Sequence, residues 1–541
     1  MSDEQISLER LPIDCTSFSD IRNSNQIYVD KTALIAEFAK LKATYFLARP
    51  RRFGKSLLIN TLADLFSNGL LNFKGLDIEN TWHDRTYKVI RIDFSNYKDK
   101  TIEEIIVNLT DELLIQTGFI DQINRLDAKG NYYTPDFILK YIATKIEDRS
   151  YVLLIDEYDA PLTHLLDNKE QLDKVISILN NFYSTVKSCS SKFRLIFITG
   201  VTRIAHLSIF SAFNNLIELT LNNKYANLLG ITDDELKKYF HPYVEYAAKI
   251  LDMPISDVYA ALKARYDGFK FSFTSNNTLY NPWSIINFFL NPQNGFKNYW
   301  FDSGGTPSIL INYLKVKRNI DIWEYKNREL TITENELYAK SEVLNIPLKL
   351  LLTQAGYFTL TDCSKSSAKL IFTNSEIEES MLRLYLTANN ITMKYETTKF
   401  VDNLCEYIDA HDIDNIIKVF NLITNDCVSP KSKFFKDEYT LRDLFYANIP
   451  NSSTLFKQKE REYTLGRSDL ELITTKTRLV IEFKLTRTNR SARAALKEGI
   501  AQIKSRRYGE TAFSRQTLFK IVLVASHKEK RILPNYSVIV D

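Results

Sequence analysis

ARPRRFGKSLLINTL, residues 48–62, decides the fold expected for the first part of this 541-residue chain. Gly54, Lys55 and Ser56 stand where an apolar run gives way to a helical pattern, and the backbone amides of a helix start can hold a phosphate. In such a loop Lys55 would contact the β and γ phosphates, and the Ser56 hydroxyl would ligate magnesium. The usual pattern, G-x-x-x-x-G-K-[ST], has glycine where this chain has Arg49. The stretch therefore predicts a phosphate-binding loop with one unusual residue at its entrance, and the alternative is a helix start that contains GKS by chance.

Predicted strands and helices alternate around this loop. The strands are short apolar runs rich in β-branched and aromatic residues, whereas the helices have apolar residues at helical spacing. This alternation is typical of a parallel sheet with helices on both faces. The predicted strands are residues 44–49, 89–95, 151–159 and 193–200, and the predicted helices are residues 56–66 and 102–119.

Two strand ends carry further candidate residues. VLLIDE, residues 152–157, ends in two acids, so we expect Asp156 to hold magnesium through water and Glu157 to polarise an attacking water. Thr199, at the end of the next strand, stands where a sensor of the γ-phosphate is expected. Arg203 follows it and is a candidate for stabilising phosphate charge, although an arginine after a strand also serves structural roles. The order of loop, acids and sensor favours a P-loop NTPase.

GRSDLELITTKTRLVIEFKL, residues 466–485, is a second informative stretch. Asp469 begins one predicted strand, and period-two alternation places Glu482 and Lys484 on one face of the next strand. On paired strands, Asp469 and Glu482 can bind one or two magnesium ions and orient water at a phosphodiester, while Lys484 stabilises the developing charge. Exposed β-hairpins also carry acids opposite lysines, so a solvated hairpin is the alternative.

Charge is distributed unevenly along the chain. Residues 431–541 contain 23 Lys and Arg against 12 Asp and Glu, whereas the first 430 residues carry a net charge of −7. A basic terminal unit on an acidic body predicts contact with a polyanion, the alternative being a small basic domain that binds no nucleic acid. The acidic, polar start and the lack of a long apolar run predict neither a signal peptide nor a membrane span. Five scattered cysteines fit reduced thiols, so a cytoplasmic protein is expected.

Seven blocks of sequence, taken in order, resemble the AAA-ATPase-like family of bacterial proteins, which often carries a terminal PD-(D/E)XK nuclease-type domain. The resemblance covers about residues 10–375 for the ATPase part. In that family the loop commonly has no leading glycine, so Arg49 is the family's own form. The blocks are YVDKT (28–32), RPRRFGKS (49–56), LIDEYDAPL (154–162), TGVTRI (199–204), YDGFKF (266–271), LYNPWS (279–284) and YWFDSG (299–304).

The resemblance implies further site residues. Arg49, a candidate nucleotide-binding residue, cannot take glycine's tight backbone, so the loop entrance is expected to differ in shape. Pro50, Arg51 and Arg52 are expected to fix this shape, and the two arginines to add positive charge near the phosphates. In the terminal domain, Gly466 to Asp469 stands in place of the family's Pro-Asp. Glu438, on the preceding helix, is expected to supply another acid. Gln502 resembles the glutamine of the helix that follows the nuclease core, and the residues after it that suit phosphate contacts are Lys504, Arg506, Arg507 and Tyr508.

The expected fold is α/β: a P-loop NTPase with a parallel sheet, a helical lid with a mixed middle region, and a C-terminal α/β restriction-endonuclease-like domain. The middle region is expected to end in a β-hairpin, followed by a helix that Asn374 or Ser375 caps, and residues 397–425 predict two helices. The expected boundaries are residues 1–230 for the ATPase core, 231–375 for the lid and middle region, 376–430 for a helical connector and 431–541 for the nuclease-like domain.

The expected function is ATP hydrolysis coupled to a magnesium-dependent nuclease-type domain, with ATP and Mg²⁺ as cofactors and defence against foreign DNA as one role. DNA is expected over RNA as the partner, and an oligomer is left open. Two alternatives remain. One is a nucleotide-dependent nucleic-acid-binding switch with an inactive nuclease fold, and the other is an ATPase that regulates a protein partner.

Overall fold

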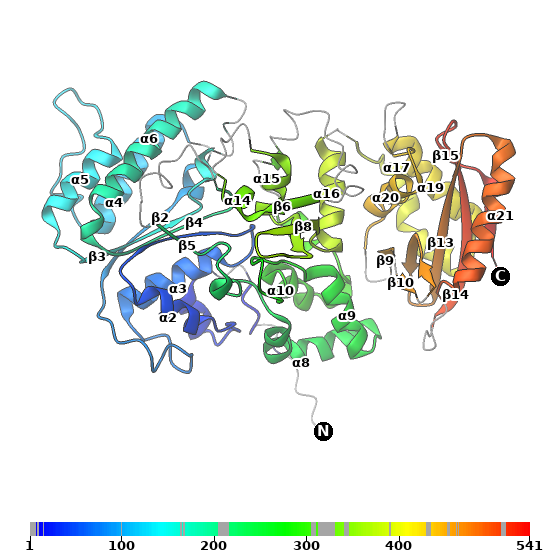
Figure 1. Ribbon diagram of the computed structural model, residues 1–541, viewed down its shortest axis with the longest axis horizontal. Coiled ribbons are helices and arrows are strands. Elements are labelled where there is room, and N and C mark those ends of the chain that lie inside the picture. Colours follow the sequence, from blue (N-terminus) through cyan, green and yellow to red (C-terminus); the bar gives the residue numbers. More distant parts are fainter. Residues whose placement is uncertain are drawn as a thin grey trace.

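The fold is described from a computed structural model of the chain (Figure 1). Along its longest axis lie an N-terminal α/β unit, a middle region and a C-terminal unit. Within the described residues, no helix combines the length and the apolar composition needed to cross a membrane. The structure describes residues 7, 10–13, 16–98, 100–162, 165, 168–203, 216–304, 310–311, 330–339, 346–388, 391–428, 434–451, 455–460, 462–463, 465–509 and 516–540.

A five-stranded parallel sheet forms the centre of the N-terminal unit, in the order β2-β3-β4-β1-β5. The inner strands are almost fully buried, as their continuous apolar sequences predict. Because β4 hydrogen-bonds to both β1 and β3, its carboxyl end lies between the loop that follows β1 and the acids that follow β3. The strands are β1 (Thr44–Ala48), β2 (Lys88–Asp93), β3 (Tyr151–Asp156), β4 (Phe193–Gly200) and β5 (Leu216–Glu218).

Helices cover both faces of this sheet, which confirms the predicted layers (Figure 1). The helix predicted over 102–119 begins as expected, with a capping box between Thr101 and Glu104. It ends two residues earlier than predicted, at Thr117, and is capped by Gly118, whose φ is 79°. One face carries α1 (Phe18–Asn23), α2 (Thr32–Ala39) and α3 (Lys55–Asn68), and the other carries α4 (Ile102–Thr117), α5 (Pro135–Lys145) and α6 (Lys169–Ser188).

The middle region combines helices with a small antiparallel sheet in the order β6-β8-β7. Strands β7 and β8 pair directly, with Leu360 opposite Leu370, which confirms the predicted hairpin. The strands are β6 (Leu330–Thr333), β7 (Phe358–Thr361) and β8 (Ser367–Phe372). The helices are α8 (Asp233–Leu251), α9 (Ile255–Tyr266), α10 (Pro282–Leu290), α11 (Tyr299–Asp302), α14 (Glu334–Tyr338) and α15 (Leu348–Gln354).

Four helices lead from the middle region to the C-terminal unit. The Asn374 side chain accepts a hydrogen bond from the amide of Ile377 at 2.9 Å, which confirms a cap at the start of α16. The prediction of two helices over 397–425 is wrong, because the chain forms three, with an interruption at Asn403 and a turn that places His411 at a φ of 54°. These helices are α16 (Ser375–Ala388), α17 (Tyr395–Asp402), α18 (Leu404–Asp409) and α19 (Ile413–Cys427).

The C-terminal unit is a mixed sheet between helices, in the order β15-β14-β13-β12-β9. Helix α21 covers one face, and α19 and α20 lie on the other (Figure 1). Strands β13 and β14 are parallel, whereas β12 and β9 run antiparallel to their neighbours. The elements are α20 (Glu438–Asn448), β9 (Phe456–Lys459), β10 (Glu462–Tyr463), β11 (Gly466–Arg467), β12 (Leu470–Ile473), β13 (Thr477–Thr486), α21 (Asn489–Arg506), β14 (Thr517–Ser526), β15 (Arg531–Ile532) and β16 (Val538–Ile539).

Gly268 tests how tightly the middle region packs. Its φ is 105°, and an added Cβ would overlap the carbonyl oxygen of Thr373. We expect Gly268→Ala to lower the free energy of unfolding by about 1–3 kcal/mol more than Gly130→Ala, the usual cost of overpacking. Gly130 is the matched control because its φ is also positive, at 82°, and no atom lies within 4 Å of an added Cβ. Equal melting-temperature losses in scanning calorimetry would contradict the close approach.

Candidate functional site

The loop between β1 and α3 has the backbone that a phosphate-binding turn needs. Gly54 immediately precedes α3 and has a φ of 96°, a conformation that favours glycine. Lys55 is the first residue of the helix and Ser56 the second, as the sequence predicts. The amide groups of this helix start therefore lie at the carboxyl edge of the parallel sheet, where α/β proteins bind ligands.

Lys55 is 5% exposed, and its ammonium group crosses the loop. Its Nζ donates to the carbonyl oxygens of Arg49 and Pro50, each at 2.9 Å. Burial lowers the pKa of Lys55, although the nearby charges of Glu157 and Asp156 act to raise it. The lysine therefore holds the loop backbone by hydrogen bonds, and its charge interacts with the acids at the end of β3.

The strand ends bring three predicted residues together. Thr199, at the end of β4, donates its hydroxyl hydrogen to Asp156 Oδ1, and the amide of Glu157 donates to the same oxygen at 3.0 Å. Glu157 has a φ of 47°, unusual for a residue other than glycine. Burial raises the pKa of Glu157, while the charges of Lys55 and Arg51 lower it. The acids and the threonine thus form one cluster facing the loop lysine.

Sequence reasoning missed Asp159, which organises the turn after β4. Its carboxylate accepts hydrogen bonds from the Thr202 amide at 2.8 Å, the Thr202 hydroxyl at 2.7 Å and the Val201 amide at 3.2 Å. Gly200 is needed at the same turn, because an added Cβ would overlap the ring of Tyr158. Asp159 is the third acid of LIDEYDAPL. Its role in holding the turn after β4 can be assigned only once β3 and β4 are known to be neighbours.

The predicted arginines bind carbonyl oxygens. Arg49 is 1% exposed, donates to the carbonyls of Thr220 at 2.6 Å and Ala48 at 3.0 Å, and lies 4.1 Å above the Phe271 ring. Arg52 donates to the carbonyl of Ser303 at 3.0 Å. Arg51 donates to the carbonyl of Gly304 at 3.5 Å. Arg49 therefore stabilises the loop entrance from within the fold, and phosphate contact by these arginines stays a prediction.

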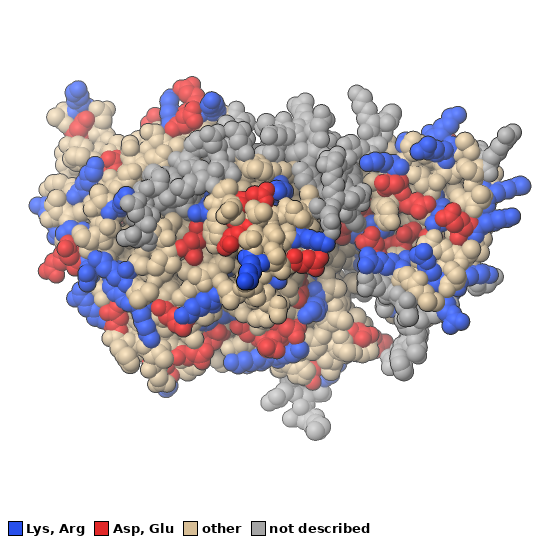
Figure 2. Space-filling view, viewed as in Figure 1, with Lys and Arg blue, Asp and Glu red and all other residues tan. Residues whose placement is uncertain are grey.

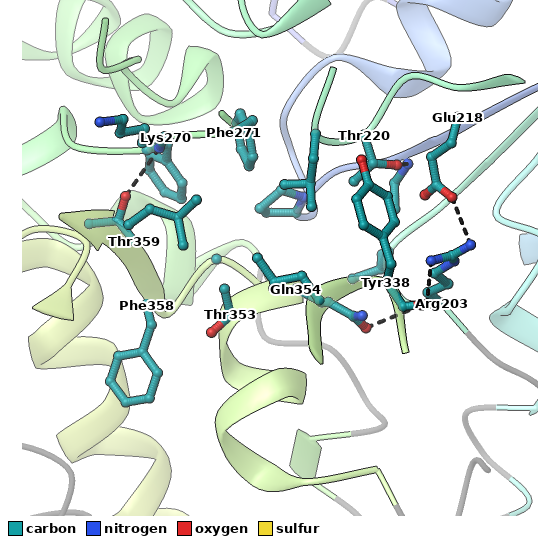
Figure 3. A pocket seen from close by; sticks show the side chains of 18 residues that line it. Arg203, Glu218, Thr220, Lys270, Phe271, Tyr338, Thr353, Gln354, Phe358 and Thr359 are labelled. Carbon is teal, nitrogen blue, oxygen red and sulfur yellow. Dashed lines mark hydrogen bonds and ion pairs between the residues drawn. The ribbon is translucent and has the colours of Figure 1, made fainter. Parts of the chain in front are cut away.

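Arg203 lines a cavity of about 50 Å³ between the parallel sheet and the middle region (Figure 3). Figure 3 shows its guanidinium beside Glu218, and the two groups form an ion pair at 2.9 Å. Arg203 also donates to the carbonyl of Tyr338 at 2.6 Å, and its amide donates to Gln354 Oε1 at 3.2 Å. These contacts give Arg203 a structural role, and its predicted role in stabilising phosphate charge stays a prediction.

The second cluster is built on β12 and β13. Their register pairs Leu470 with Ile481, which sets Asp469 opposite Glu482. The amide of Phe483 donates to Asp469 Oδ2 at 2.8 Å and fixes this carboxylate. The predicted Asp469, immediately before β12, and the predicted Glu482, on β13, are therefore brought together.

Lys484 connects this cluster to two helices. Its Nζ donates to Glu482 Oε1 at 3.1 Å and to Gln502 Oε1 at 2.9 Å. It also lies 3.8 Å from Glu438 Oε2 on α20 and 3.5 Å from Glu498 Oε1 on α21. Three of the predicted residues, Glu482, Gln502 and Glu438, thus lie around the ammonium group of Lys484.

The charge of this cluster favours a bound cation. Glu482 is 1% exposed, and its Oε2 has no hydrogen-bond partner among the described residues. Burial, and then the charge of Asp469, raise the pKa of Glu482 to about 8. Burial also raises the pKa values of Asp469 and Glu438. A divalent cation would satisfy the free oxygen and the repulsion between carboxylates.

The two carboxylates suit a magnesium ion that keeps several water ligands, and not a metal ion held by protein side chains alone. No group of three His, Cys, Asp or Glu side chains that could hold a metal occurs in the described part of the chain. Magnesium is commonly bound through one or two carboxylates with several waters and substrate phosphate oxygens. Asp469 and Glu482 would supply the two carboxylate ligands of such a magnesium ion.

The structure adds one residue to the cluster, Glu498, and corrects the prediction for another, Tyr508. Glu498 lies four residues before Gln502 on α21, so helical spacing alone could have placed both on one face. Tyr508, predicted to contact phosphate, is instead fully buried and accepts a hydrogen bond from Arg506 Nη1 at 2.9 Å. Tyr508 therefore orients Arg506, and its predicted contact with phosphate is wrong because the ring lies inside the fold.

Comparisons with known proteins match two separate parts of the chain. Residues 12–210 match a family described as a predicted AAA-ATPase, and residues 436–534 match the PD-(D/E)XK nuclease superfamily. The chain is also similar to a protein of Azotobacter chroococcum mcd 1 described as an uncharacterized protein in the vnfD 5' region. The two are 28% identical over 382 residues, which is 70% of each chain.

Glu482→Gln tests the buried carboxylate through the pH dependence of stability. Because the pKa of about 8 lies above the ordinary 4.5, the folded protein holds the proton more tightly than the unfolded chain. This stabilisation is complete below the unfolded pKa and is lost as the pH rises through the folded pKa. We expect the variant to gain melting temperature relative to wild type between about pH 5 and pH 8.5, measured by calorimetry with chelator.

The matched control is Glu406→Gln, at an exposed position. The difference in melting temperature between this variant and wild type should stay constant over the same pH range. A constant difference for Glu482→Gln would contradict the raised pKa.

Proposed function

Because the chain joins an AAA-ATPase-like domain to a domain of the PD-(D/E)XK nuclease superfamily, we propose that it couples ATP hydrolysis to magnesium-dependent cleavage of nucleic acid. The observation that carries the proposal is the arrangement around Lys484. Lys484 contacts Glu482 and a helix glutamine, and the strand register sets Asp469, just before β12, opposite Glu482. We further propose the expected boundaries after residues 230, 375 and 430.

In the proposed nucleotide site, the helix start at Gly54 to Ser56 binds phosphate oxygens through amide groups, and Lys55 adds a positive charge. Ser56 and Asp156 would hold magnesium, which would neutralise phosphate charge when bound. Glu157 orients and polarises the attacking water, and its raised pKa makes the carboxylate a stronger proton acceptor than an exposed glutamate. Thr199 bonds to Asp156 and so positions the strand end where the γ-phosphate would lie.

In the proposed nuclease site, Asp469 and Glu482 would hold magnesium, which would activate water and offset phosphate charge when bound. Lys484 stabilises the negative charge that develops on the phosphate. Gln502 and Glu438 hold this lysine from opposite helices. The site therefore has a separate side chain for each requirement of phosphodiester hydrolysis.

The proposed partner is nucleic acid, DNA in preference to RNA, bound by the basic terminal domain. Figure 2 shows Lys and Arg side chains along the outer margin of this unit. Exposed cations near the cluster include Arg467, Lys504, Arg506 and Arg507. A role in defence against foreign DNA is part of the proposal, and its support is the pairing of a nuclease-type domain with an ATPase-like one.

The nucleotide half is tested by Lys55→Met and Glu157→Gln. We expect Lys55→Met to weaken ATP binding about 10- to 100-fold, the usual range for losing a hydrogen bond to a charged group. Glu157→Gln should bind ATP and slow phosphate release about 10²–10⁴-fold, because general-base assistance is lost. Calorimetric titration and phosphate release measure these effects. Lys74→Met, at an exposed lysine of the same unit, is the control, and unchanged ATP affinity in Lys55→Met would overturn the assignment.

The nuclease half is tested on single- and double-stranded DNA and RNA with magnesium or manganese, with and without ATP. We expect metal-dependent cleavage in wild type that falls at least about 100-fold in Asp469→Asn, as expected for loss of metal-assisted chemistry. Asp414→Asn, at an exposed acid, should cleave normally. Salt-dependent binding without cleavage in wild type would instead support a nucleic-acid-binding switch.

A further inference from the structure

The phosphate-binding loop is hydrogen-bonded to the middle region through Trp300. The indole Nε1 of Trp300 donates to the carbonyl of Arg51 at 3.3 Å, and its ring packs against Tyr357 at 5.3 Å between centroids. The backbone amide of Trp300 donates to Glu376 Oε1, on α16, at 2.9 Å. The YWFDSG block, whose chemistry the sequence did not explain, thus ties the loop to α16.

Helix α16 carries buried carboxylates at the centre of the molecule. Ser284, in the LYNPWS block, donates to Glu376 Oε2 at 2.8 Å. One turn further on, Glu379 is 1% exposed and accepts from Arg265, at the end of α9, at 2.7 Å. Figure 1 shows α16 between the N-terminal sheet and the terminal unit. Helix α16 therefore has polar contacts with α9, α10 and α11 of the middle region.

The other side of α16 is ion-paired to the terminal domain. Lys457 of β9 lies 3.1 Å from Glu379 Oε1, and its Nζ donates to the carbonyls of Tyr446 and Ile449. Lys459, two residues further along β9, pairs with Glu378 at 2.8 Å. All the groups are largely buried, so the pairs are weakly screened by salt.

From β9 the contacts continue to the proposed nuclease site. Lys459 also pairs with Asp443 at 2.9 Å, which pairs with Arg442 at 3.2 Å. Arg442 donates to Glu460 at 2.9 Å. The amide of Glu460 donates to the carbonyl of Asp469 at 3.2 Å. The chain of contacts therefore ends on the backbone of a residue proposed to hold magnesium.

We propose that Trp300, Glu379 and Lys457 are positioning residues through which nucleotide at the loop sets the geometry of Asp469. The inference rests on the proposed function and adds the physical route that joins its two sites. Nucleotide phosphates act on Lys55 and on the loop backbone that includes Arg51, so they bias the position of Trp300. The later contacts are buried or partly buried hydrogen bonds and ion pairs, which resist lengthening and transmit a displacement.

The test measures hydrogen exchange of the full chain with and without a non-hydrolysable ATP analogue and magnesium. In wild type, we expect the analogue to change the exchange rates of β9 and β12 amides at least about fivefold, the low end of usual coupling between sites. In Trp300→Phe and Lys457→Met, this change should disappear while analogue affinity stays within about twofold. A purely structural role would lower melting temperature without removing the response to nucleotide.

Two matched substitutions serve as controls. Trp82→Phe removes the same ring volume from a buried tryptophan whose indole N–H has no hydrogen-bond partner among the described residues. Lys476→Met makes the same change as Lys457→Met in an exposed turn of the terminal domain. Both should keep the full nucleotide response.

The outcomes separate this inference from the proposed function. If wild type binds the analogue and β9 and β12 do not respond, the inference is overturned and the nucleotide site stands. If the variants respond as wild type does, the inference is also overturned. If wild type does not bind the analogue, the proposed function itself fails. Near-ultraviolet circular dichroism establishes folding, and Trp300→Phe keeps the test decisive should Lys457→Met not fold.

Discussion

The ion pairs of one buried carboxylate, Glu379, hold the middle region and the C-terminal unit in their arrangement. Although burial acts to raise its pKa, the charges of Lys457, Arg265 and Arg383 hold that pKa at about 2. These cations come from three different elements, so α16 must keep its place relative to both α9 and β9. Removing one partner of a buried pair usually costs about 3–5 kcal/mol, because a charge is left without compensation. The pairs therefore fix geometry more than they add net stability.

Both candidate sites follow from how strands are paired. In the N-terminal unit, parallel strands deliver the loop, the acids and Thr199 to one edge because β4 is inserted between β1 and β3. In the C-terminal unit, antiparallel pairing of β12 with β13 sets Asp469 opposite Glu482. In each case the charge of a buried lysine acts on a glutamate whose pKa is raised by burial. The same physical rule thus builds two sites of different chemistry.

The sequence predicted what depends on local pattern. Glycine before a helix, apolar strands ending in acids and a Glu-x-Lys alternation all act within a few residues, so Lys55, Asp156 and Glu482 could be placed correctly. Partners far apart in sequence could not be predicted in this way. Arg49 bonds to Thr220, and Lys457 pairs with Glu379, because the folded chain brings them together. Local periodicity gave no sign of either contact, nor of the turn that splits residues 397–425 into three helices.

These long-range pairs also change what the charge of the terminal domain means. The domain contains 23 basic and 12 acidic residues, which suggests a strongly cationic surface. Yet Lys457 and Lys459 are buried against Glu379 and Glu378, which belong to the acidic body of the chain. Two of the positive charges therefore hold the domain in place and are not available to a polyanion. For the proposed binding of nucleic acid, the exposed cations around the cluster remain for phosphate contact, so the proposal rests on the surface potential there and not on the net charge of the domain.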